Sequence, residues 1–234
     1  MGLKCLGLYC SLNIEFAQHF YPLFYKAVAA CDVTAETCIK VIFDLVIVFG
    51  RQLFSTNEAI DQNNQENSPK RLNQQQQQSF ENLFQQFKHL INAGGATKKK
   101  VEVPVEIKAV IVEGFAKVLL NQTSLLIHTS DDTNDTQPLQ LDPSHLENML
   151  TELVSFYFES SANEDNKARQ VLSAFLPLFC FSDPIRQNLL ARVFIRCVLA
   201  MVEKADDQIP AHIQYLFWLV SLIFLNIFWI ELLF

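Results

Sequence analysis

The side chains that could carry chemistry do not gather into a recognisable active site. None of the five histidines stands four residues from another, the helical spacing that brings two imidazoles to one metal ion. They are His19, His89, His128, His145 and His212. The chain also has no glycine-rich phosphate loop, no H-E-x-x-H and no G-x-S-x-G sequence. We therefore expect no catalytic residues, no metal, no cofactor and no enzyme activity.

The six cysteines lie in apolar stretches with helical character. Cysteine is among the residue types most often buried, so we interpret these side chains as buried, reduced thiols of an intracellular protein. They are Cys5, Cys10, Cys31, Cys38, Cys180 and Cys197.

Basic residues provide the one interaction site that the sequence predicts. Four basic positions fall within a sector of roughly 120° on one helix, beside its apolar face: Arg186, Arg192, Arg196 and Lys204. Such a stripe suits phosphates or an acidic partner, and the run Lys98, Lys99 and Lys100 adds a second basic cluster. A solvated helix face and a solvated linker end are the alternatives, because the net charge of −7 does not indicate nucleic acid binding.

Helical periodicity dominates the segments that must position these residues. From Ile107 to Leu119 the apolar residues recur at the intervals of one helical face, and Glu113 and Lys117 form an i, i+4 pair beside it. Gly114 lies inside this helix, where glycine costs about 1 kcal/mol relative to alanine. We therefore expect Gly114 to let another helix approach closely.

Two further helices begin with the same pair of residues. Asp142–Pro143 and Asp183–Pro184 each combine a capping aspartate with a proline at the first helical position. The other expected helices cover Leu3 to Leu12, Phe16 to Ala30, Thr34 to Phe49 and Lys167 to Phe181. Prolines inside FYPLF (Phe20–Phe24) and FLPLF (Phe175–Phe179) predict kinked helices and suggest an internal repeat.

Composition divides the chain into four parts. Residues 1–56 and 101–214 carry short apolar helices joined by polar turns, without strand signals, which predicts an all-α fold: an α-solenoid of antiparallel helix pairs. Residues 57–100, with DQNNQENSPKRLNQQQQQ, form a Gln/Asn-rich low-complexity linker. We expect this polar insertion to be disordered except for a short helix from Phe80 to Ile91. Residues 215–234 form a hydrophobic tail.

The tail, YLFWLVSLIFLNIFWIELLF, is long enough as a helix to cross the roughly 30 Å hydrocarbon core of a membrane. Its flanks fit a membrane less well, because the nearest upstream charges are Asp206 and Asp207 and Glu231 lies near the far end. We hypothesise that FLNIFWIELLF is an intron read through into protein, since A/T-rich non-coding DNA tends to encode residues such as Phe, Leu, Ile and Asn. Further solenoid helices and a genuine anchor are the alternatives.

Four stretches resemble, in this order, the C-terminal part of the condensin HEAT-repeat subunit family, CAP-G. They are LKCLGLYCSL (Leu3–Leu12), FYPLF followed by IKVIFDLVIVFG (Ile39–Gly50), AVIVEGFAKVLL (Ala109–Leu120) and ARQVLSAFLPLFCFS (Ala168–Ser182). The resemblance covers most of Leu3 to about Lys204 apart from the insertion, and it implies a HEAT-type solenoid. Because the family proteins are several times longer, we expect the chain to be a fragment or a partial gene model.

The resemblance also implies a function. The family supplies a non-catalytic condensin subunit that works with two structural-maintenance-of-chromosomes ATPases and a kleisin, in the nucleus and on condensed mitotic chromosomes. Its solenoid binds a kleisin segment, and the two together hold DNA. The matched motifs are packing motifs, so no contact residue is carried over. A HEAT scaffold in transport or signalling and a tail-anchored membrane adaptor are the alternatives, of which the adaptor is disfavoured.

Overall fold

The part of the chain that the computed structural model describes is almost entirely helical. It comprises residues 2–30, 33–54, 69–92, 103–121, 143–159 and 166–204, and none of these ranges contains a strand. The helices are α1 (Gly2–Cys10), α2 (Ile14–Ala29), α3 (Ala35–Phe49), α4 (Pro69–Asn92), α5 (Val105–Asn121), α6 (Pro143–Glu159), α7 (Asn166–Ser182) and α8 (Pro184–Lys204), with a short 3-10 helix, η1 (Gly50–Phe54). The all-α class and the helices expected in these ranges are confirmed.

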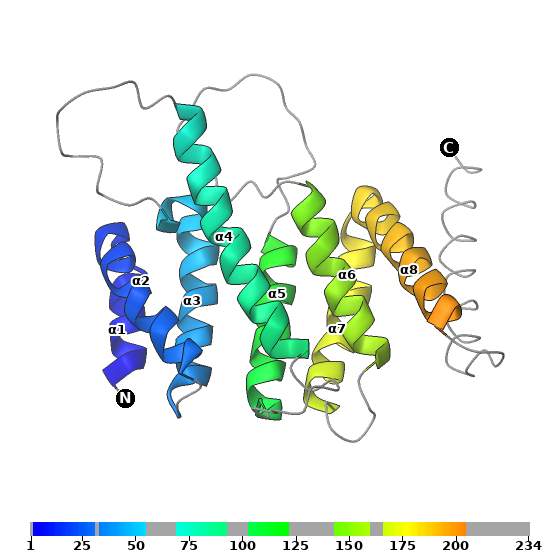
Figure 1. Ribbon diagram of the computed structural model, residues 1–234, viewed down its shortest axis with the longest axis horizontal. Helices are drawn as coiled ribbons and strands as arrows, with labels where there is room; N and C mark the ends of the chain where they lie inside the picture. Colours follow the sequence, from blue (N-terminus) through cyan, green and yellow to red (C-terminus); the bar gives the residue numbers. More distant parts are fainter. Residues whose placement is uncertain are drawn as a thin grey trace.

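The helices stack in chain order in two layers (Figure 1). One layer consists of α1, α3, α5 and α7, each packed against the next. The other consists of α4, α6 and α8, and α2 contacts it through η1. The layers are joined where α5 contacts α4 and α6, and where α7 contacts α6 and α8. This progression of neighbour contacts is that of an α-solenoid, while its assignment to the HEAT type stays a prediction.

Local sequence signals set several helix ends. The amide of Glu15 donates to Asn13 Oδ1 (2.7 Å) at the start of α2. The amide of Ile185 donates to Asp183 Oδ1 (2.7 Å) at the start of α8, which confirms the aspartate start signal there. Asp142, the other expected capping aspartate, lies outside the described residues. α3 ends at Phe49, and its C-cap Gly50 has a φ of 57°, which favours glycine.

The polar insertion differs from expectation because it contributes a helix to the core. α4 begins at Pro69 and ends at Asn92, so the expected short helix is confirmed and is longer than predicted. Its second half buries a helically spaced apolar stripe: Phe80, Leu83, Phe84, Phe87 and Ile91. Such a stripe is enough to dock a helix even where the average composition is polar. The remainder of 57–100 lies outside the described residues.

Phenylalanine rings hold α3, α4 and α5 together. The ring centroid of Phe43 lies 5.0 Å from that of Phe87 and 5.4 Å from that of Phe115. Gly114 faces Phe43 so closely that a Cβ at this position would overlap the ring. The prediction that Gly114 permits a close helix approach is therefore confirmed. The pair of Glu113 and Lys117 (2.7 Å) also forms on α5 as predicted.

Two further expectations concern prolines and the membrane. Pro22 and Pro177 lie inside α2 and α7, and both helices continue through them.

Within the described ranges, no helix combines the length and the apolar character needed to span a bilayer. The hydrophobic tail from Tyr215 onward lies outside these ranges.

Candidate functional site

Arg186 does not belong to the exposed basic stripe that the sequence predicted. Its side chain is 3% exposed. Its Nη2 donates to the carbonyl oxygen of Leu120 (3.2 Å), its Nη1 donates to Ser182 Oγ (3.1 Å), and its guanidinium lies over the Phe179 ring. Leu120 is in the last turn of α5, so Arg186 places a cation at the negative end of that helix. The expectation is corrected here: Arg186 is a packing residue, because its long side chain turns inward to cap α5.

Arg192 and Arg196 lie on the exposed face of α8, one turn apart. Arg196 forms an ion pair with Glu147 of α6. Lys204 ends α8, but its side chain is outside the described part of the chain. Lys98, Lys99 and Lys100 also lie outside it. Among the basic residues predicted to contact a partner, the structure therefore describes two as exposed, Arg192 and Arg196.

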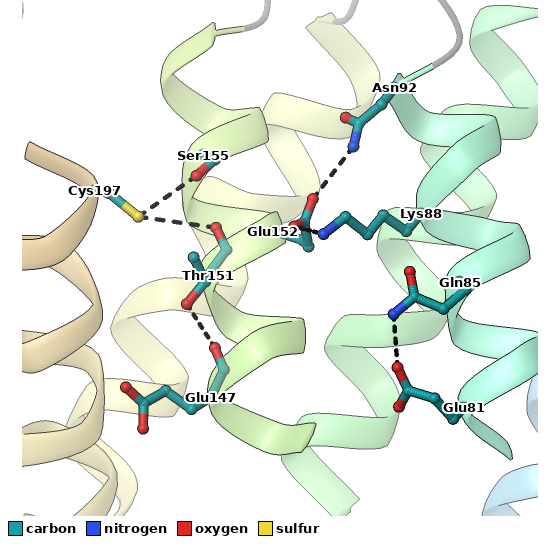
Figure 2. A network of polar contacts seen from close by, with 9 residues as sticks. All are labelled: Glu81, Gln85, Lys88, Asn92, Glu147, Thr151, Glu152, Ser155 and Cys197. Carbon is teal, nitrogen blue, oxygen red and sulfur yellow. Dashed lines mark hydrogen bonds and ion pairs between the residues drawn. The ribbon is translucent and has the colours of Figure 1, made fainter. Parts of the chain in front are cut away.

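Polar contacts between α4 and α6 were not anticipated from the sequence. Lys88 Nζ forms an ion pair with Glu152, and Asn92 Nδ2 donates to the same carboxylate (3.3 Å) (Figure 2). Nearer the start of α6, His145 Nε2 lies 2.6 Å from Glu81 Oε2. These contacts fix how α4 crosses α6, since each joins a side chain of one helix to a side chain of the other.

A second set of polar contacts joins α6 to α8. The carboxylate of Glu147 pairs with Arg196. Ser155 Oγ lies 3.5 Å from Cys197 Sγ (Figure 2). Glu147 and Glu152 stand about 140° apart around α6, so they reach neighbours on either side. That spacing of two acids beside the apolar face is the sequence signal that could have revealed these contacts. Partly exposed ion pairs stabilise the folded state by at most about 1 kcal/mol each. We therefore infer that these pairs mainly orient α6 relative to its neighbours.

The described residues offer little reactive chemistry. They contain no group of three or more His, Cys, Asp or Glu side chains that could hold a metal ion. Burial raises the pKa of the Cys10 and Cys180 thiols, which lowers their thiolate fraction and their nucleophilicity at neutral pH. Burial lowers the pKa of the Arg186 guanidinium, and Asp183 opposes that shift.

The cysteines mostly follow the prediction of buried thiols. Four of them are buried: Cys10, Cys38, Cys180 and Cys197. Cys5, on α1, is exposed and departs from the prediction. Cys31 lies outside the described residues.

Comparison with known families gives a match over most of the chain. A model of the family described as nuclear condensing complex subunits, C-terminal domain, matches residues 1–215. The match therefore runs through α1 to α8 and continues past the end of α8 at Lys204.

Two curated relatives are similar to this chain, and both are named condensin complex subunit 3. The protein of Schizosaccharomyces pombe is 24% identical over 215 residues, which cover 91% of this chain. The protein of Xenopus laevis is 21% identical over 199 residues, which cover 83% of this chain. The chain spans about a fifth of their lengths, 19% and 18% respectively. No solved structure matches the chain.

Proposed function

The chain belongs to the family of nuclear condensing complex subunits, and we propose that it acts as a non-catalytic, binding subunit of condensin. The observation that carries this proposal is the family match over residues 1–215, which includes every described helix. The stacked helices support it physically, because a solenoid presents an extended surface on which a partner segment can lie. Its place of action would be the nucleus and the condensed mitotic chromosome.

The partners in this proposal are a kleisin and the two structural-maintenance-of-chromosomes ATPases. Both curated relatives carry the name of a condensin subunit, which supports membership of the same complex. A kleisin segment that is extended when free could order itself along the stack, and burial of its apolar residues would offset the entropy that it loses.

We further propose that this chain contacts DNA within the complex. Arg192 and Arg196 are exposed one turn apart on α8, a spacing at which two guanidinium groups can approach neighbouring phosphates. Lys204 follows on the same helix, and Lys98 to Lys100 would add charge. Glu147 competes for Arg196, so we expect Arg192 to contribute more than Arg196 does.

Membership of the complex is tested by immunoprecipitating the endogenous protein from dividing cells in mild detergent and identifying its partners by mass spectrometry. We expect both ATPases and the kleisin in amounts similar to that of the protein itself. Recovery of membrane proteins or transport factors without the ATPases would contradict the proposal.

DNA contact is tested on the reconstituted complex with paired charge reversals. We expect Arg192→Glu with Arg196→Glu to weaken DNA binding several-fold and to reduce the slope of log K against log salt by about two. Lys4→Glu with Lys26→Glu is the matched control, because it makes the same charge change at exposed positions of α1 and α2. Equal weakening by both pairs would show a general charge effect and would contradict a contact at α8.

A further inference from the structure

We draw no further inference here: the strongest candidate, the exposed apolar face at the α1 and α2 end of the stack (Leu8, Tyr9, Leu12 and Phe16), carries none, because nothing in the described part of the structure shows what covers it.

Discussion

The three arginines of α8 carry the same charge in different surroundings. Arg186 is buried and donates hydrogen bonds to Leu120 and Ser182. Arg196 is largely exposed and pairs with Glu147, and Arg192 is exposed. An exposed ion pair changes stability by at most about 1 kcal/mol, whereas a buried carbonyl that loses its donor costs about 1–3 kcal/mol. We therefore expect these arginines to differ in what their replacement does to folding.

Arg186→Met should lower the free energy of unfolding by about 1–3 kcal/mol, because it removes the donor to the Leu120 carbonyl at the end of α5. Arg192→Met, the matched change on the exposed face, should stay within about 0.5 kcal/mol. Urea unfolding followed by far-ultraviolet circular dichroism measures both. Equal stability of the two variants would show that the cap on α5 contributes nothing.

Replacing a glycine inside a helix by alanine usually stabilises the helix, but we expect Gly114→Ala to destabilise this one. Alanine is favoured over glycine in a helix interior by about 1 kcal/mol, but here the added methyl group would overlap the Phe43 ring. Overpacking costs about 1–3 kcal/mol, so we expect net destabilisation and a lower thermal midpoint. Gly2→Ala is the control, since no heavy atom of the described structure lies within 4 Å of the added methyl group. A higher midpoint for Gly114→Ala would mean that α3 moves away without cost.

At the scale of elements, α4 shows how a helix can be part of the core despite its composition. In its described second half, Glu81, Lys88 and Asn92 contact α6, while the apolar stripe reaches Phe43 and Phe115. The ion pair of Lys88 with Glu152 then fixes the crossing with α6. Removing an apolar side chain from α4 should therefore destabilise the whole centre of the stack.

Phe87→Ala should cost about 3–5 kcal/mol, because it leaves a cavity among the rings of α3 and α5. His89→Ala lies two residues further along the same helix on its exposed side and should change stability by less than about 0.5 kcal/mol. Chemical denaturation of both variants measures the difference. A small effect of Phe87→Ala would mean that α4 is attached only loosely to its neighbours.

At the scale of the whole molecule, stability is distributed along the stack. Among the described helices, the strongest contacts join helices that are near neighbours in the chain, so the free energy of unfolding is approximately a sum of local contributions. A defect at one end should then loosen that end first. This separates a solenoid from a compact bundle, in which one defect weakens all helices together.

Leu172→Ala in α7 tests this distribution, because Leu172 is fully buried near the C-terminal end of the described stack. We expect hydrogen exchange to accelerate in α7 and α8 and to stay unchanged in α2 and α3. Uniform acceleration across all helices would instead show that the described residues unfold as one unit.

Much of the architecture followed from the sequence, because helix formation is encoded locally. Apolar periodicity predicted α2, α3, α5 and α7, and Asp183–Pro184 predicted the start of α8. The role of Gly114 also followed, since glycine inside a strongly apolar helix has few uses besides a close approach. The family resemblance rested on the same packing motifs, and the family match agrees with it.

Only the tertiary structure decided which residues of those helices are available to partners. A helical projection places Arg186 beside Arg192 and Arg196, but it cannot show that the end of α5 lies within reach of one of the three. It likewise cannot show that α6 directs Glu147 toward α8 and Glu152 toward α4. The physical reason is that periodicity is a property of one helix, whereas burial and charge pairing depend on which helices pack against it.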